Sequence, residues 1–178
     1  MPKRQPEIWA ISDIRNDAAL EALLLRLPRG SGLIYRHYHL PPAERRARFD
    51  RLAAIARRRG HRVILAGTAA EARAWGADGA YGSPSRLAHG PAMLRLVTAH
   101  ALGEIARARR ARADAVVLSP VFATRSHPGA RTLGLLRFRL LAARARLPVI
   151  ALGGMTTARA CRIGTAWAAI DGLIPEDS

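Results

Sequence analysis

Short apolar segments alternate with helix-like segments along nearly the whole chain, and this alternation constrains the fold more than any other feature of the sequence. The apolar segments end at glycine, proline or polar residues, as buried strands do. We predict strands over 8–12, 32–36, 62–66, 94–98, 115–118, 149–152 and 166–170, with one further strand entered through the turn at 76–81.

The segments between these strands have helical spacing of their apolar residues. A helix is predicted over 16–27, with Asn16 as candidate N-cap, and Pro41 and Pro42 open a long amphipathic helix that stops at Gly60. Thr68 is predicted to cap a helix that runs to Trp75. Further helices are predicted over 102–111, 135–146 and 156–162, and a loop over 84–90.

Eight strands separated by helices predict an α/β fold, a (β/α)8 TIM barrel, formed by one domain over 1–178. A chain of 178 residues is short for a fold that typically takes about 250. We therefore expect a trimmed barrel with clipped loops, a vestigial helix after the fourth strand and an incomplete last helix. An open doubly wound sheet is the alternative, but no GxGxxG follows the first strand, which disfavours a dinucleotide-binding fold.

The formal net charge of +16 comes almost entirely from arginine, since Lys3 is the only lysine. These arginines recur on predicted helix faces, so we interpret most of them as solvated surface and consider nucleic acid an unlikely partner. Such a charge also attracts small phosphorylated substrates. No apolar run is long enough to cross a bilayer and no signal peptide is visible, so no membrane partner is expected. The single cysteine, Cys161, fits a cytoplasmic location.

Residues that could bind or react with a ligand gather at the predicted carboxyl ends of strands, where active sites lie in parallel α/β folds. The loop after 115–118 contains Thr124 and Arg125, and the strand 149–152 ends in Gly153 and Gly154. Paired glycines let a backbone approach an anion closely and direct N–H groups at phosphate oxygens. Arg36 ends a predicted strand, so its charge needs a partner or a ligand.

Several of these segments together resemble the thiamine-phosphate synthase family, which includes a TenI-like branch of thiazole tautomerases. The segment 119–127, SPVFATRSH, resembles the family motif GPVFxTxTK, and 148–154, PVIALGG, resembles PVVAIGG. Weaker similarity extends to Ser12-Asp13, to Arg36 within the family's QLREK, to the turn 76–79, and to His100 followed by Glu104.

This resemblance implies a cytoplasmic enzyme that couples hydroxymethylpyrimidine pyrophosphate to thiazole phosphate and releases pyrophosphate. It implies catalytic roles for Arg36, Thr98 and His127. It implies substrate or phosphate binding by a further set of residues, namely Thr124, Ser126, Gly153, Gly154, His100 and Arg125. It also makes a homodimer possible.

The chain departs from the family where the family binds Mg²⁺. An Asn-Asp pair after the third strand is replaced by Ala66-Gly67, and no carboxylate occurs in the segment 81–86 that replaces QxD. Mg²⁺ is expected from the family, but its aspartate ligands are missing, so no metal ligand is predicted here. The alternatives are a TenI-like thiazole tautomerase, whose usual histidine is replaced by Pro120, and a non-catalytic homologue that binds a phosphate ligand.

Overall fold

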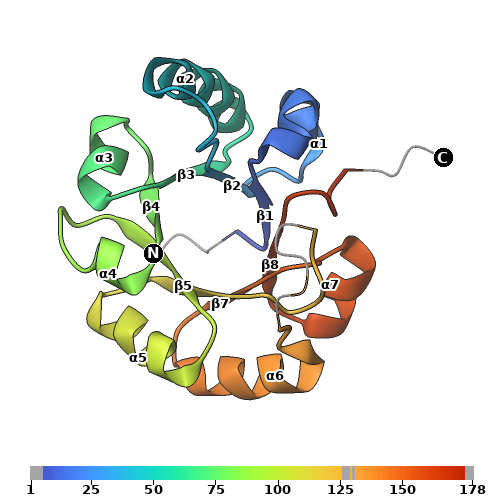
Figure 1. The fold of residues 1–178 in the computed structure, drawn as a ribbon. Helices are drawn as coiled ribbons and strands as arrows, with labels where there is room; N and C mark the ends of the chain where they lie inside the picture. The colour runs from blue at the N-terminus through green and yellow to red at the C-terminus, as the bar shows by residue number, and fades with distance from the viewer. Residues whose placement is uncertain (1–5, 126–128, 130, 175–178) are drawn as a thin grey trace.

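The computed structural model describes residues 6–125, 129 and 131–174, and in these residues eight parallel strands close into a barrel in the order β1 to β8. Each strand pairs with the next in sequence, and β8 pairs with β1 to complete the ring (Figure 1). The predicted (β/α)8 barrel is therefore confirmed, and the open doubly wound sheet is excluded.

The strands are short and nearly all buried. They are β1 (Ile8–Ile11), β2 (Gly32–Tyr35), β3 (Arg62–Ala66), β4 (Gly79–Gly82), β5 (Leu94–Ala99), β6 (Ala115–Leu118), β7 (Val149–Leu152) and β8 (Ala166–Ala169). The bounds of β3, β6 and β7 agree with the sequence prediction, and those of β1, β2, β5 and β8 differ from it by one residue at the end of the strand. The strand expected after the turn at 76–81 is β4.

Helices surround the barrel in Figure 1 and cover its outer face. They are η1 (Ile14–Ala19), α1 (Leu20–Arg26), α2 (Pro42–Arg58), α3 (Ala69–Ala74), α4 (Pro84–Leu87), α5 (Leu102–Arg110), α6 (Gly134–Ala145) and α7 (Thr157–Ile163). The short α4 is the vestigial helix expected after the fourth strand, although the segment 84–90 was predicted as loop. Thr68 caps α3 as predicted, accepting from the Glu71 N–H at 3.1 Å.

The first helical segment begins earlier than predicted, and Asn16 is not its N-cap. Asp13 is the N-cap of the 3₁₀ turn η1, and Asn16 is the third residue of that turn. The Asn16 side chain is buried between the end of β1 and the residue after β8, and it bonds to both. Its amide donates to Ile11 O and to Ile170 O, each at 2.9 Å, and its Oδ1 accepts from the Asp13 N–H at 2.8 Å. Asn16 thus joins the ends of β1 and β8, which no local pattern predicts.

Alternate residues along each strand fill the inside of the barrel, since successive side chains point to opposite faces. Trp9 is the largest of these interior side chains, and its indole lies against Gly32 on the neighbouring strand. A Cβ at Gly32 would lie 2.1 Å from Trp9 Cε3, so only glycine leaves room for the ring. A second, larger apolar layer packs between the strands and the helices.

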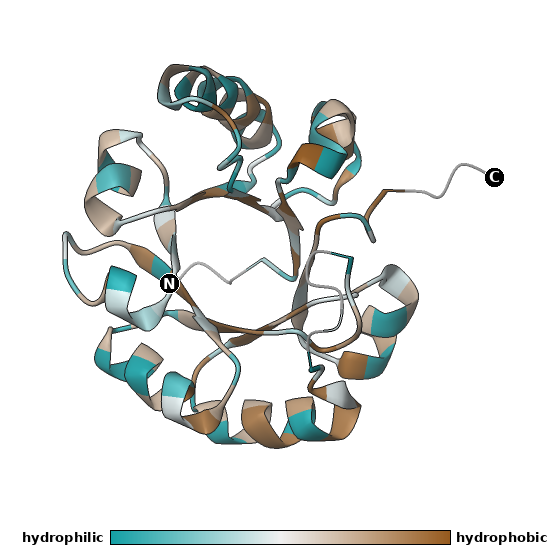
Figure 2. Ribbon diagram, in the orientation of Figure 1, coloured by the Kyte–Doolittle hydropathy of each residue, from teal (hydrophilic) through white to brown (hydrophobic). Residues whose placement is uncertain are grey.

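Hydrophilic positions lie mainly on the helices and loops in Figure 2, while the strands are mostly neutral to hydrophobic. The arginines of α5 and those of the second half of α2 are exposed, as predicted for helix faces, whereas Arg45, Arg46 and Arg48 in the first half of α2 are partly buried. Within the described part of the chain, no helix is both long enough and apolar enough to cross a membrane.

Candidate functional site

The carboxyl ends of the strands surround a pocket of about 1380 Å³. Its walls come from β4 and from the segments at and after the carboxyl ends of β1, β2 and β5 through β8, so residues far apart in sequence meet there. Seven of the nine predicted site residues line it: Arg36, Thr98, His100, Thr124, Arg125, Gly153 and Gly154. The other two, Ser126 and His127, lie outside the described residues. The roles of all nine stay predictions.

Gly153 and Gly154 form a tight backbone corner at the end of β7, with φ of +97° and +59°. The loop after β6 is held against this corner by the Val121 N–H, which donates to Leu152 O at 2.8 Å, and by the Phe122 N–H, which donates to Gly153 O at 3.0 Å. No hydrogen bond among the described residues uses the N–H of Gly153 or Gly154 as donor. Both glycines line the pocket, so this corner is a candidate anion site.

Arg36 follows β2 and combines a fixed backbone with a guanidinium that is not committed to the protein. Its N–H donates to Ser12 Oγ at 2.7 Å, and its carbonyl accepts from Arg45 Nε at 2.9 Å. Within the described residues the guanidinium makes no hydrogen bond, and its partner is the Tyr38 ring, with Cζ 5.6 Å from the centroid. A half-buried cation held this way is available to a ligand.

His100 lies at the pocket wall with one ring nitrogen already in use. Its Nδ1 lies 2.5 Å from Ser119 O, and since a carbonyl only accepts, Nδ1 carries the proton. In the neutral ring Nε2 is then the bare nitrogen. The backbone N–H of His100 donates to Glu104 Oε2 at 2.6 Å, which fixes the start of α5 against the loop. His100 itself lines the pocket.

Tyrosines contribute the flat surfaces of the pocket. Tyr81 on β4 and Tyr38 after β2 both line it. Burial raises the pKa of Tyr81 to about 12, against the opposing charge of Arg36, so its phenol stays protonated. Of the two aromatic residues that follow Arg36, Tyr38 lines the pocket, whereas His37 is buried beside Tyr35.

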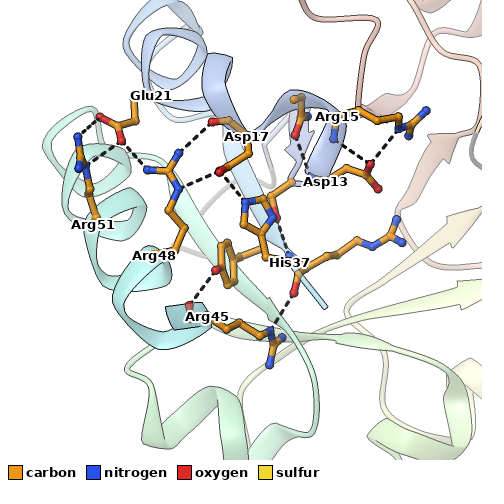
Figure 3. A network of polar contacts seen from close by, with 12 residues as sticks. Asp13, Arg15, Asp17, Glu21, His37, Arg45, Arg48 and Arg51 are labelled. Carbon is orange, nitrogen blue, oxygen red and sulfur yellow. Dashed lines mark hydrogen bonds and ion pairs between the residues drawn. The ribbon is translucent and has the colours of Figure 1, made fainter. Parts of the chain in front are cut away.

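His37 belongs to an ionic network behind the pocket wall, drawn in Figure 3. Its Nε2 lies 2.7 Å from Asp17 Oδ1, and Arg48 Nε donates to the same oxygen at 2.8 Å. Burial lowers the pKa of His37 more than Asp17 raises it. Burial also acts to raise the pKa of Asp17, but the hydrogen bonds from His37 and Arg48 outweigh it and lower that pKa. The network fastens η1 to α2 and supports the end of β2.

Sequence reasoning missed three charged residues of the pocket: Arg15, Arg159 and Asp171. Each lies in the segment that follows a strand, Arg15 in η1 and Arg159 in α7, which is the available signal, but nothing in the local sequence indicates which residues of these segments line the pocket. Arg15 Nη1 pairs with Asp171 Oδ2 at 3.0 Å, joining the loops after β1 and β8. The Arg159 guanidinium donates to Gly154 O and lies 4.8 Å from the Phe122 ring centroid.

The donor set of this pocket does not fit a magnesium ion held by the protein. Mg²⁺ takes oxygen ligands, usually with one or two carboxylates. Among the described lining residues Asp171 is the one carboxylate, and it is paired with Arg15. No three His, Cys, Asp or Glu side chains cluster as metal ligands in the described part of the chain.

A (β/α)8 barrel whose ligand pocket lies at the carboxyl ends of its strands, with a glycine corner and arginines in its wall, defines the general class of this protein. Residues 8–170 match the family model described as thiamine monophosphate synthase. The chain belongs to this family, as the resemblance of its motifs predicts.

Individual relatives agree with this assignment over different lengths. A curated protein of Aquifex aeolicus (strain VF5), named "Putative thiamine-phosphate synthase 2", is 41% identical over 59 residues. That match spans 33% of this chain and 32% of the relative, about a third of each.

Solved structures share the fold. A thiamine phosphate pyrophosphorylase from Pyrococcus furiosus superposes with a TM-score of 0.80 at 21% identity, covering 97% of this chain and 90% of that one. A 2-keto-3-deoxy-6-phosphogluconate aldolase of Zymomonas mobilis ZM4 reaches a TM-score of 0.63 at 14% identity, covering 98% and 85%. At such identities these matches show the barrel architecture alone.

Proposed function

We propose that the protein couples hydroxymethylpyrimidine pyrophosphate to thiazole phosphate and releases pyrophosphate, as its family membership suggests. The observation that carries the proposal is the meeting of Arg36, Thr98, Thr124 and the Gly153-Gly154 corner in one pocket. Two anion-binding features in a single pocket suit a reaction between two phosphorylated substrates.

The chemistry needs a leaving group whose negative charge is stabilised as the bond breaks. The C–O bond of the pyrimidine methylene breaks and its electron pair leaves with pyrophosphate. The thiazole nitrogen then forms the C–N bond with its lone pair. Arg36 is assigned to the pyrophosphate, because guanidinium binds phosphoryl oxygens in pairs. The backbone donors of Gly153 and Gly154 are assigned to the thiazole phosphate.

The test is formation of thiamine phosphate from the two substrates by the purified full-length protein, followed by mass spectrometry. Replacing Arg36→Gln is expected to lower the rate at least about tenfold, because one charge-assisted contact to the leaving group is lost. The matched control is Arg58→Gln, which removes the same charge from the exposed last residue of α2. No product with the unaltered protein, with or without Mg²⁺, would reject the proposal.

A second candidate is the thiazole tautomerase activity of the TenI-like branch, and the bare Nε2 of His100 favours it. A proton transfer needs an acid or base at the pocket but no departing pyrophosphate. Thiazole phosphate incubated in deuterated water distinguishes the two reactions. Deuterium uptake that is lost in His100→Gln supports the tautomerase, and binding without uptake or coupling supports a non-catalytic phosphate-binding homologue.

Partners and location stay predictions as well. We expect small phosphorylated substrates, no nucleic-acid partner, a possible homodimer and a cytoplasmic location. Sedimentation of the purified protein measures its oligomeric state. Binding of unrelated DNA that persists at physiological salt would argue against the interpretation of the arginines as solvated surface.

A further inference from the structure

The pocket carries far more positive than negative charge. Four arginines, Arg15, Arg36, Arg125 and Arg159, are among its described lining residues, against the single carboxylate of Asp171. Arg15 already neutralises that carboxylate. A pocket of this composition attracts polyanions directly and repels cations.

The carboxyl end of β3 is occupied by an arginine–glutamate pair. Arg45 reaches it from α2, donating from Nη2 to Ala66 O at 2.9 Å and from Nη1 to Glu71 Oε1 at 3.0 Å (Figure 3 shows Arg45). Glu71 Oε2 lies 2.3 Å from where a Cβ on Gly67 would be, so the glutamate fills the space beside that glycine. The carboxylate near the β3 end is therefore paired with Arg45, and a side chain at Gly67 would have to displace Glu71 from this position.

The same Arg45 also fixes Arg36 from two sides. Its Nε donates to Arg36 O at 2.9 Å, and its guanidinium lies 5.4 Å from the Tyr38 ring centroid. The Tyr38 ring lies 5.6 Å from the Arg36 guanidinium. The backbone and the ring contact of Arg36 are thus both held, which orients its guanidinium before a ligand arrives and lowers the entropy that binding costs.

From these observations we infer that the pocket binds the diphosphate group of its substrate through arginine side chains, Arg36 foremost, without a divalent cation. The inference rests on the proposed function for the identity of the substrate and concerns how its charge is neutralised. Arg36 contributes paired N–H donors in the geometry that phosphoryl oxygens accept. Arg45 is a positioning residue, because its own donors are consumed within the protein.

The test is calorimetric titration of the full-length protein with inorganic pyrophosphate, in EDTA and in excess Mg²⁺, at physiological ionic strength. Binding in EDTA is expected, and Mg²⁺ is expected to leave it unchanged or weaken it, because the free anion is the ligand. Arg36→Gln is expected to weaken binding at least about tenfold, while Arg58→Gln changes it less than about twofold. Circular dichroism confirms that each variant is folded.

Three results would overturn the inference: no binding in EDTA, binding tightened more than about threefold by Mg²⁺, or equal effects of the two substitutions. Failure of the proposed function looks different. Metal-independent, Arg36-dependent binding without formation of thiamine phosphate rejects the synthase reaction and keeps the inference. Coupling that requires Mg²⁺ keeps the reaction and rejects the inference.

Discussion

Gly153 and Gly154 follow β7 and each faces a different part of the loop after β6. A Cβ on Gly153 would lie 2.7 Å from Pro120 Cα, and one on Gly154 would lie 2.3 Å from Ala123 O. Both obstacles belong to the backbone, so they do not move aside as a flexible side chain does. The absence of side chains at these two positions lets the loop after β6 pack closely against the pocket wall.

We predict that Gly153→Ala lowers the free energy of unfolding by about 3 kcal/mol, because left-handed strain adds to the backbone clash. The control is Gly164→Ala, where φ is +69° but nothing lies within 4 Å of the new Cβ. It is expected to cost about 1 kcal/mol, from strain alone. Urea unfolding measures both losses. Equal losses would show that the contact with Pro120 does not limit this position.

Among the helices, α2 does most to shape the pocket although it lies outside it. Its Arg45 bonds to the last carbonyl of β3. The same side chain bonds to the carbonyl after β2, and Arg48 bonds to Asp17 of η1 (Figure 3). Three consecutive carboxyl ends of the barrel are thereby tied to one helix. Arg45 also lies 5.0 Å from the Trp75 ring centroid, so its side chain is packed as well as hydrogen-bonded.

Removing the Arg45 side chain is expected to destabilise the protein more than removing that of the adjacent Arg46. We predict that Arg45→Ala lowers the free energy of unfolding by about 2–4 kcal/mol. The substitution removes the hydrogen bonds that Arg45 donates to two backbone carbonyls and to the Glu71 carboxylate in partly buried surroundings. Arg46→Ala loses an exposed i,i+4 pair with Asp50 and is expected to cost less than about 1 kcal/mol. Urea unfolding compares the two variants, and similar losses would contradict a special role for Arg45.

For the whole molecule, the histidines and carboxylates whose pKa is lowered all act in the same direction on stability. Burial lowers the pKa of His37 and of His61 below its ordinary value. The hydrogen bonds of Arg48 foremost, aided by Arg51, lower the pKa of Glu21, and those of His37 and Arg48 lower that of Asp17 against the effect of burial. In each case the unfolded chain binds protons at a higher pH than the folded protein does, so acid favours unfolding.

We therefore predict that the free energy of unfolding is steady between about pH 7 and 8 and falls as the pH drops below about 6.5, where unfolded histidines take up protons. It falls further below about pH 4.5, where unfolded carboxylates do so. Urea unfolding across this range measures the profile. His61→Gln is expected to reduce the first fall, and His89→Gln, at an exposed position, to leave it unchanged. Greater stability at pH 5 than at pH 7 would contradict the prediction.

Local sequence by itself determined the alternation of strands and helices, and with it the barrel. Residues two apart along a strand share a face, so buried alternation shows in the sequence without knowledge of the partner strand. The bounds of β3, β6 and β7, the cap at Thr68 and the end of α2 at Gly60 depend on neighbours only a few residues away. Arg36 and the glycine corner were also recognisable, because strand ends face one rim of a parallel barrel.

The tertiary structure alone decided which charges meet. Asn16 was expected to cap a helix, but it joins Ile11 to Ile170 because barrel closure brings β1 beside β8. Arg15 and Arg159 could not be distinguished by sequence from the many surface arginines, since facing the pocket depends on loops that are distant along the chain. The pairing of Arg45 with Glu71 at the end of β3 has the same origin. Long-range contacts choose among residues whose local patterns are alike, and here they determined the charge of the pocket.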